Sequence, residues 1–359
     1  MNECKFELFN LSKIENLIGA TIVIKPKDED ITYGYKIHSH LGNGSVGNVY
    51  LLEFLNKKDY VIKISKDSCK KDILNELQIF TYLDKNKNEK IIPIYYGKIE
   101  NTKQYGIVYN YLGQNNFDVF KINNYNLFSF NNNIDIIKQI IKQLISFNNI
   151  IHCDFKGTNI IIDIKNNKII STITDLGLSN LAIPKKTVLS TNYVTSPESL
   201  LTITEYNKCI VNNKDLNIKK HDYFGLFAFI LNLFLIKHYW IVLTEYLHTE
   251  LNIEFKFLAS QEASAIYVYI WYKFNNSYSN NESLRNVIHE IENKFPQLQT
   301  MNIINFDLYF KLYILPNLNL NLINKEKTLQ LYHFLSLLIK FDPEDRPIFE
   351  ELLNHSFLN

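Results

Sequence analysis

Residues 150–162 read IIHCDFKGTNIII, and this stretch places the polar residues His152, Asp154, Lys156 and Asn159 between two apolar runs. Asp154 can accept the proton of a hydroxyl group, and Lys156 can neutralise a phosphate that is being transferred. Asn159 can ligate a hard cation through its amide oxygen. Each of these residues alone is typical of a polar loop, but their close spacing is hard to explain by solvation and indicates phosphoryl-transfer chemistry.

A second carboxylate follows the next predicted hairpin. The segment IIIDIKNNKIIST (residues 160–172) predicts two strands with KNNK at their turn. Asp175, in the triplet Asp175-Leu176-Gly177, lies 16 residues after Asn159. A carboxylate at this position could bind an Mg²⁺ ion that bridges phosphates.

A glycine cluster lies upstream, in LGNGSVGNVY (residues 41–50), where Gly42, Gly44 and Gly47 form a GxGxxG pattern. The chain has only 11 glycines and 8 prolines, so the cluster is informative, although the pattern alone also fits a dinucleotide-binding loop or an ordinary turn. A dinucleotide fingerprint opens a helix, whereas strand-like residues follow here. The sequence therefore predicts a β-hairpin loop whose amides can close over phosphates.

Lys63 lies 16 residues after Gly47, in the apolar frame VIKI (residues 61–64). This frame predicts a buried stem and an ammonium group directed into a cleft, although an exposed strand lysine is the alternative. Glu76 lies in a helical stretch that we predict from about Ser68 to Leu83, and it is the best candidate for the anionic partner of Lys63. The alternative for Glu76 is a solvated position on the helix surface.

The pattern of elements changes along the chain. Residues 37–110 read mostly as short strands with one helix, and the periodicity after residue 113 is mostly helical. This pattern predicts an α+β fold with a small antiparallel β-sheet lobe, containing one helix, and a larger, mainly helical lobe at 111–359. Residues 1–36 fit neither lobe and are predicted to form an N-terminal extension.

Composition and charge exclude several classes of protein. The 38 Lys and Arg residues and 37 Asp and Glu residues give a net charge of +1 without a basic block, so neither nucleic-acid binding nor a polybasic membrane anchor is predicted. The apolar run 223–236 has 14 residues, fewer than the roughly 20 that a membrane span needs, and predicts a buried core helix. Four cysteines without CxxC spacing, and a start unlike a signal peptide, predict reduced thiols and an intracellular, cytoplasmic location.

Taken together, these motifs resemble those of the eukaryotic-type protein kinase superfamily over about residues 37–359. GNGSVGNV (residues 42–49) looks like its glycine-rich loop, Lys63 like its phosphate-binding lysine and Glu76 like the helix partner of that lysine. HCDFKGTN (residues 152–159) resembles its catalytic loop, and DLG (residues 175–177) resembles its magnesium-binding triplet.

Further similarities lie downstream. The triplet Ser196-Pro197-Glu198 and residues 221–224 resemble the family's APE triplet and the start of its central helix. The last segment, FDPEDRPIFEELLNHSF (residues 341–357), is similar to the closing kinase segment, and its Arg346 is expected to pair with Glu198. The resemblance therefore implies a two-lobed protein kinase-like fold with lobes at 37–110 and 111–359.

The resemblance also implies a serine/threonine protein kinase that uses ATP and Mg²⁺ and acts on protein substrates. Asp154 would be the catalytic base, Lys156 would stabilise the γ-phosphate, and Asn159 and Asp175 would hold Mg²⁺. The residues expected to bind the nucleotide are Gly42, Gly44, Gly47, Val49, Val61, Lys63 with its partner Glu76, and the hinge backbone of Asn110 and Leu112.

Three features depart from the family pattern. Cys153 stands where an arginine commonly precedes the catalytic aspartate, and Tyr109 would be a bulky gatekeeper beside the nucleotide pocket. The stretch from Asp222 to Arg346 is longer than a minimal kinase needs, which predicts an insert near 272–330.

The Asn, Ile and Lys bias fits an AT-rich genome, such as that of a large DNA virus or a protist, and a viral protein would act in the host cytoplasm.

Two other classes of function stay open, a pseudokinase that acts as a binding scaffold and a small-molecule kinase. Retention of Lys63, Asp154, Asn159 and Asp175 together favours catalysis, because a scaffold has no chemical need for all four. The triplet at 196–198 and Arg346 disfavour a small-molecule kinase, since such enzymes usually lack both. The sequence leaves the protein substrate and the oligomeric state open.

Overall fold

The structure of the chain is a computed structural model that describes residues 2–9, 17–27, 30–44, 46–67, 70–83, 88–113, 115–181, 220–251, 260–275, 282–300 and 302–359. The chain divides into two compact units. The first comprises Met1–Asn116 and Ile161–Leu178, and the second comprises Phe117–Ile160 and Ser179–Asn359. The triplet at 196–198, for which the sequence made predictions, lies outside the described residues.

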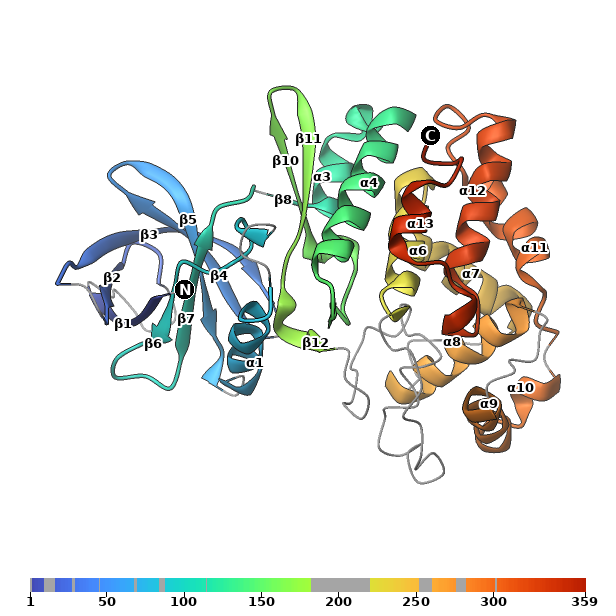
Figure 1. Cartoon of the computed structure of the whole chain (residues 1–359), viewed down its shortest axis with the longest axis horizontal. Helices are drawn as coiled ribbons and strands as arrows, with labels where there is room; N and C mark the ends of the chain where they lie inside the picture. Colours follow the sequence, from blue (N-terminus) through green and yellow to red (C-terminus); the bar gives the residue numbers. More distant parts are fainter. Residues whose placement is uncertain are drawn as a thin grey trace. The chain divides into compact units, whose positions relative to one another are not determined.

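The first unit is built around a closed barrel of strands, drawn in blue and teal in Figure 1. Its strands are β1 (Asn2–Phe9), β2 (Thr21–Pro26), β3 (Tyr33–Asn43), β4 (Gly47–Phe54), β5 (Lys57–Ser65), β6 (Tyr95–Lys98) and β7 (Tyr105–Asn110). The strands follow the order β1-β2-β3-β4-β5-β7-β6. The barrel closes because β1 pairs antiparallel with β2 and parallel with β6.

Alternate residues of the strands fill the barrel interior. The buried side chains of this core include Phe6, Ile22, Ile24, Tyr35, Ile37, Tyr50, Leu52, Ile62, Ile64 and Val108. Successive residues of a strand point to opposite faces of a sheet. Lys63 and Tyr109, which neighbour core residues on β5 and β7, are therefore placed on the outer face of the barrel.

The described residues among the first 36 belong to the barrel and do not form a separate extension. Phe6, Ile22 and Ile24 are fully buried in the barrel core, and β3 already begins at Tyr33. The stretch TIVIKP (residues 21–26) buries every second residue, which is the pattern of a half-buried strand. By contrast, the parallel pairing of β1 with β6 joins distant parts of the chain and leaves no local pattern in the sequence.

One helix and one hairpin complete the first unit. Helix α1 (Lys70–Phe80) confirms the predicted helix, and its Ile73 and Leu77 pack against Ile107 of β7. Strands β10 (Ile160–Lys165) and β11 (Lys168–Ile173) form the predicted hairpin, and β10 also pairs with β8 (Asn115–Asn116). The turn residues Asn166 and Asn167 have φ angles of 51° and 60°, which suit a tight hairpin turn.

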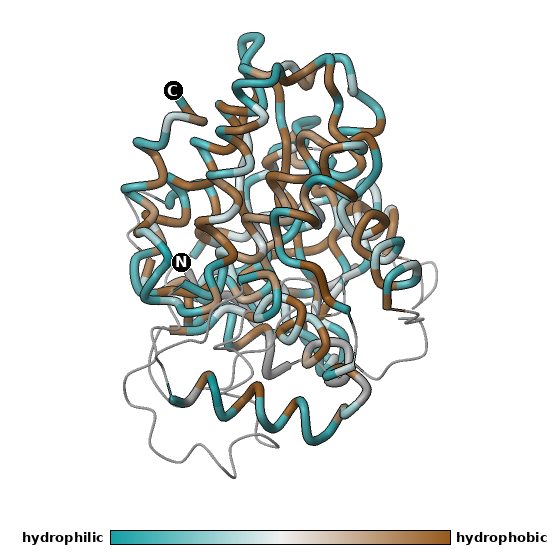
Figure 2. The backbone as a smooth tube through the Cα atoms, turned by 90° about the vertical axis from the view of Figure 1, so that its right-hand side faces the viewer, coloured by the Kyte–Doolittle hydropathy of each residue, from teal (hydrophilic) through white to brown (hydrophobic). Residues whose placement is uncertain are grey.

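The second unit is mainly helical. Its α-helices are α3 (Phe117–Asn123), α4 (Phe130–Ser146), α6 (Tyr223–Phe234), α7 (Tyr239–Leu251), α8 (Ser260–Phe274), α9 (Glu282–Lys294), α10 (Gln297–Thr300), α11 (Phe306–Tyr309), α12 (Lys325–Leu338) and α13 (Phe349–Leu353). A short ribbon, β9 (Ile150–Ile151) with β12 (Asn180–Leu181), also belongs to it. Figure 2 shows hydrophobic and hydrophilic residues alternating along the helical segments, as amphipathic packing requires.

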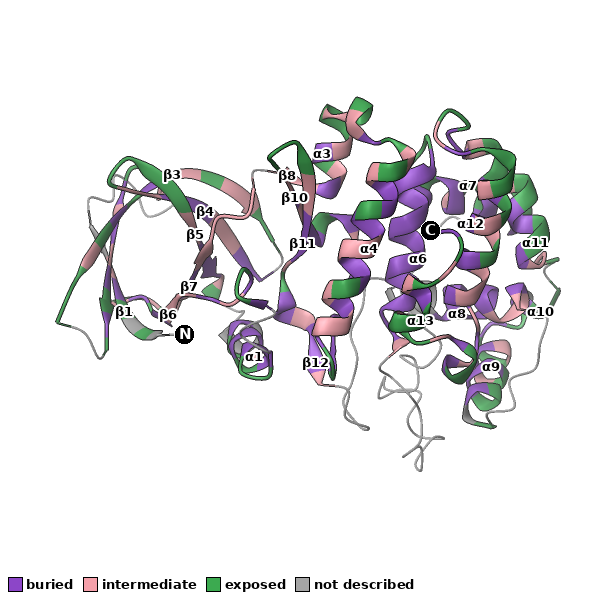
Figure 3. Cartoon of the chain, turned by 45° about the horizontal axis from the view of Figure 1, so that its top comes forward, coloured by how far each residue is buried: buried purple, intermediate pink, exposed green. Residues whose placement is uncertain are grey.

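Helix α6 is the centre of the helical core. All of its residues are buried, as Figure 3 shows by its continuous purple ribbon. A helix that is apolar on every side needs protein contacts all around it, and α6 contacts α4, α7 and α12. Within the described parts of the chain, no helix is long and apolar enough to cross a membrane.

Part of the region predicted as an insert folds into helices. The described residues between 282 and 317 include α9, α10 and α11, and a π-helical turn (Phe310–Ile314) continues α11. Leu284, Val287 and Ile291 of α9 are buried, so this helix has a packed apolar face. That the region is an insert stays a prediction.

Candidate active site

Lys63 and its partners form a charged cluster in the first unit. Lys63 lies on β5, and its Nζ atom is 2.8 Å from Oε2 of Glu76 and 2.7 Å from Oδ1 of Asp175. Glu76 comes from α1, and Asp175 follows β11. The fold thus joins three predicted site residues that are far apart in the sequence.

The two carboxylates decide the protonation of Lys63. Burial by itself lowers the pKa of an ammonium group, but Glu76 and Asp175 outweigh this effect and raise the pKa of Lys63. Burial raises the pKa of Glu76, and Lys63 opposes this shift. Lys63 is therefore a fixed positive charge at neutral pH, which suits a side chain that binds phosphate.

Asp175 occupies an uncommon backbone conformation. Its φ angle is 63°, in the left-handed region that residues other than glycine rarely adopt, and such conformations concentrate at functional sites. The following turn is tied to α1, because Asn75 Nδ2 donates to the carbonyl oxygen of Gly177 at 3.1 Å. The Asp175 side chain keeps 41% of its surface exposed, so solvent still reaches this carboxylate.

The predicted glycine-rich loop lies between β3 and β4, as the sequence indicates. Gly44 N donates to Gly47 O at 2.9 Å, and Lys66 Nζ donates to Gly44 O at 2.7 Å. A Cβ atom on Gly47 would lie 2.5 Å from the carbonyl oxygen of Ile64, so only glycine fits this close approach of two strands. Gly42 has open space around it.

The valines predicted to bind the nucleotide lie near Lys63 in the sheet register. Val49 pairs with Lys63 across β4 and β5, and Val61 pairs with Tyr109 across β5 and β7. Both valines are partly buried. The hinge residues Asn110 and Leu112 follow at the end of β7, where Tyr111 N donates to Asp59 O at 2.7 Å.

In the second unit, the buried carboxylate of Asp222 holds the predicted catalytic loop. The backbone amides of His152 and Cys153 donate to Asp222 Oδ2 and Oδ1 at 2.7 and 3.0 Å. Cys153 has a φ angle of 66°, so the chain turns sharply just before Asp154. From the sequence, Asp222 was expected only at the start of a helix, because this contact joins residues about 70 positions apart and leaves no local pattern.

Asp154 is bound by the two residues predicted to act with it. Lys156 Nζ lies 2.7 Å from Asp154 Oδ2. Asn159 Nδ2 donates to Asp154 Oδ2 at 3.0 Å and to the Asp154 carbonyl oxygen at 2.8 Å. A carboxylate, a cation and an amide are thus held together within six residues, an arrangement suited to phosphoryl transfer.

Two glycines that the sequence analysis did not select bring helices close to this loop. A Cβ atom on Gly225 of α6 would lie 2.5 Å from the carbonyl oxygen of Phe155. A Cβ atom on Gly157 would overlap with Oδ1 of Asp118 on α3. In a chain with 11 glycines, the available signal was that Gly157 lies within the HCDFKGTN segment and that Gly225 directly follows residues 221–224.

A comparison with known protein families matches residues 35–358 to the protein kinase domain. The chain belongs to the protein kinase family. A β-rich first unit and a helical second unit confirm the two-lobed kinase fold that the motifs predicted.

A curated relative agrees with this assignment. The kinase is 28% identical over 186 residues to human dual specificity tyrosine-phosphorylation-regulated kinase 4. The alignment covers 50% of this chain and 36% of the human protein, so it spans about a third of that relative.

The metal-binding residues predicted for this kinase suit Mg²⁺. Asp175 offers a carboxylate and Asn159 an amide oxygen, and Mg²⁺ prefers such oxygen ligands. Asn159 donates through its Nδ2 atom to Asp154, and the oxygen of the same amide is the atom that could ligate a cation. The described residues contain no cluster of three or more His, Cys, Asp or Glu side chains, and Mg²⁺ in kinases commonly takes few protein ligands besides phosphate oxygens.

Arg346 of the kinase is a buried cation with backbone partners. Its side chain is 1% exposed, and its Nε and Nη1 atoms donate to the carbonyl oxygens of Lys340 and Lys220, each at 2.8 Å. The guanidinium also lies 4.8 Å from the ring centroid of Phe224 on α6. Glu198, its predicted partner, lies outside the described residues.

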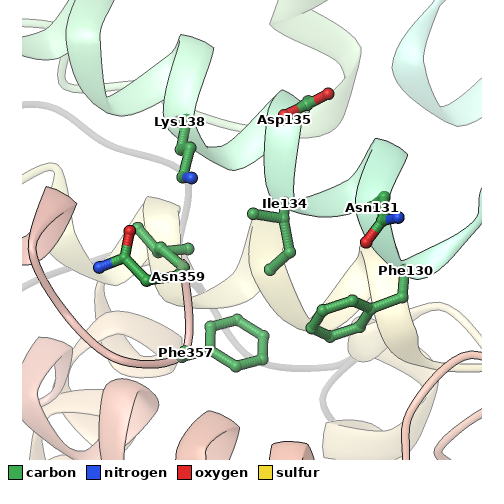
Figure 4. A pocket seen from close by; sticks show the side chains of 8 residues that line it. Phe130, Asn131, Ile134, Asp135, Lys138, Phe357 and Asn359 are labelled. Carbon is green, nitrogen blue, oxygen red and sulfur yellow. The ribbon is translucent and has the colours of Figure 1, made fainter.

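The second unit also contains a cavity whose lining includes none of the predicted site residues. It measures about 230 Å³ and is lined by Phe130, Asn131, Ile134, Asp135, Lys138, Phe357, Leu358 and Asn359. Figure 4 shows the Phe130 and Phe357 rings with Ile134 on its apolar side. None of the predicted site residues lines this cavity, so it contributes nothing to the candidate active site.

Proposed function

We propose that this protein kinase is catalytically active and transfers the γ-phosphoryl group of ATP to serine or threonine hydroxyls of protein substrates. One observation carries the proposal: Asp154 is bound by both Lys156 and Asn159 within the catalytic loop. The ion pair of Lys63 with Glu76 supports it, because a kinase needs a fixed cation for the nucleotide phosphates.

Each residue of the loop has a distinct role in this proposal. Asp154 accepts the proton of the acceptor hydroxyl, and Lys156 places a positive charge beside that carboxylate. Asn159 holds the Asp154 side chain through its amide and can offer its oxygen to Mg²⁺. When bound, ATP supplies the phosphoryl group and Mg²⁺ screens its negative charge.

The acceptor residue is the finer part of the proposal. Lys156, two residues after the proposed base, is the feature of the family resemblance that points to serine or threonine as the acceptor. The human relative carries a name that includes dual specificity, so tyrosine is the alternative acceptor to be tested. Action on intracellular, cytoplasmic protein substrates stays a prediction from the sequence.

The test is transfer of radiolabelled γ-phosphate to protein by the wild type and by Asp154→Asn. Loss of the base should lower kcat on the order of 100-fold or more. Asp135→Asn, the same change at an exposed position of α4, should retain wild-type activity. Hydrolysis of the labelled protein should yield phosphoserine or phosphothreonine, and phosphotyrosine would overturn the proposed acceptor.

Two outcomes would replace the proposal by another class of function. Label at background level with the wild type, or equal label with Asp154→Asn, would favour a pseudokinase scaffold. Label that passes only to metabolites and never to protein would favour a small-molecule kinase.

A further inference from the structure

Glu76 is a buried carboxylate with a donor on each of its oxygens. Its side chain is 2% exposed, Oε2 accepts from Lys63 Nζ at 2.8 Å, and Oε1 accepts from the Tyr109 hydroxyl at 2.8 Å. A buried carboxylate oxygen without a donor destabilises the folded state. The contact with Tyr109 is therefore as much a condition for burying Glu76 as the contact with Lys63.

Tyr109 joins β7 to α1 in two ways. Its ring centroid is 6.0 Å from that of Phe80, and its hydroxyl reaches Glu76, which lies one helical turn before Phe80. The ring supplies an apolar contact, and the hydroxyl supplies a directional hydrogen bond. Phenylalanine at position 109 would keep the first contact and lose the second.

The charges around Glu76 settle which atom donates. Glu76 faces Lys63 from β5, Tyr109 from β7 and Asp175 beyond β11. Burial of the hydroxyl, and next the Glu76 carboxylate, hold the pKa of Tyr109 well above its ordinary value. Tyr109 is therefore protonated at neutral pH and donates to the carboxylate.

We propose that Tyr109 is a positioning residue for phosphoryl transfer, because its hydroxyl fixes one oxygen of Glu76 and thereby holds the other oxygen against Lys63. This inference rests on the proposed function. It gives Tyr109 a role in addition to its size. A side chain that only filled space beside the nucleotide pocket would act through its ring and would not need the hydroxyl.

The first test is steady-state kinetics of Tyr109→Phe with ATP as the varied substrate. A hydrogen bond to a charged group is lost, so kcat should fall about tenfold. KM for ATP should change less than about threefold, because the shape of the pocket is kept. Replacement of Tyr109 by p-aminophenylalanine restores a donor at the same place and should bring kcat back to within about threefold of the wild type.

The second test does not depend on activity. Unfolding by urea is measured for the wild type, Tyr109→Phe, Glu76→Gln and the double variant. If the hydroxyl acts through the Glu76 carboxylate, the free energy of unfolding lost in the double variant should be smaller than the sum of the losses in the two single variants. Strict additivity would overturn the proposal even if the wild type proved to be catalytically inactive.

Tyr60→Phe is the matched control, since Tyr60 is a partly buried tyrosine of β5 in the same barrel. It should leave kcat and KM unchanged. The proposed role of the Tyr109 hydroxyl would be overturned if Tyr109→Phe kept the wild-type kcat. It would also be overturned if the variant raised KM for ATP and retained kcat. Absence of phosphoryl transfer by the wild type would instead contradict the proposed function, so failure of that proposal is distinguishable from failure of the Tyr109 proposal.

Discussion

Gly42 and Gly47 belong to the same glycine-rich stretch, but their surroundings differ. Gly47 stands where β4 approaches β5, with space for no side-chain atom beside the carbonyl of Ile64. Gly42 pairs with Val49 in the sheet and has no heavy atom within 4 Å of a Cβ position. Of these two glycines, therefore, only Gly47 is required by a close approach of two strands.

At Gly47, we predict that substitution by alanine displaces β4 from β5. Gly47→Ala should lower the free energy of unfolding by about 1–3 kcal/mol, because the obstructing atom is backbone that cannot rotate away. Gly42→Ala, the control, should change it by less than about 0.5 kcal/mol. Urea unfolding measures both, and equal effects of the two substitutions would contradict the steric explanation.

Among the elements, α3 is tied to the C-terminal end of α6 by one lysine. Lys121 of α3 donates to the carbonyl oxygens of Asn232 and, at 3.0 Å, Leu235. Burial lowers the pKa of Lys121 to about 8, although Asp118 partly opposes the shift. Since α3 also contacts Gly157, this tie helps to hold α3 beside the catalytic loop.

The lowered pKa of Lys121 predicts how stability depends on pH. An unfolded lysine titrates near 10.5, so from about pH 8 to 10.5 the unfolded state binds more protons at this site, and stability rises with pH. The free energy of unfolding of the wild type, relative to Lys121→Met, should therefore increase between pH 7 and 9.5. A difference that stays constant over this range would show that Lys121 is not the group responsible.

For the whole molecule, the first strands complete a barrel that begins before the matched kinase domain at residue 35. Phe6 is fully buried, and a Cβ atom on Gly106 would lie 3.2 Å from its ring. Because β5 and β7 share this core, the strand that carries Lys63 is supported by residues outside the matched domain.

Phe6→Ala should therefore destabilise the unit that carries Lys63. Removal of a buried phenylalanine ring typically costs about 3–5 kcal/mol. Lys5→Ala, at the exposed neighbouring position on β1, is the control and should stay within about 0.5 kcal/mol of the wild type. An unchanged melting temperature in Phe6→Ala would show that β1 is dispensable.

Much of the candidate site was readable from local sequence. Asp154, Lys156 and Asn159 lie within six residues, so their proximity follows from short spacing, and the structure joins them by direct contacts. The helix around Glu76 and the KNNK hairpin were likewise visible as local periodicity and turn residues.

Contacts between distant segments were the part that sequence could not supply. The sequence made Glu76 a candidate partner for Lys63, but only the tertiary structure brings Glu76 of α1 and Asp175, which follows β11, to the same ammonium group. Two further contacts of this long-range kind are the hydrogen bond from the Tyr109 hydroxyl to Glu76 and the bond from the His152 amide to the Asp222 carboxylate.

The type and spacing of Asp154, Lys156 and Asn159 are local properties, so the chain's residues alone were enough to predict phosphoryl-transfer chemistry for this loop. Only the packed fold shows that Tyr109 contacts Glu76, that Asp222 contacts the backbone before Asp154, and that the first two strands belong to the barrel. The physical reason is that a buried polar group or an unpaired strand must find a partner, and the fold alone determines where on the chain that partner lies.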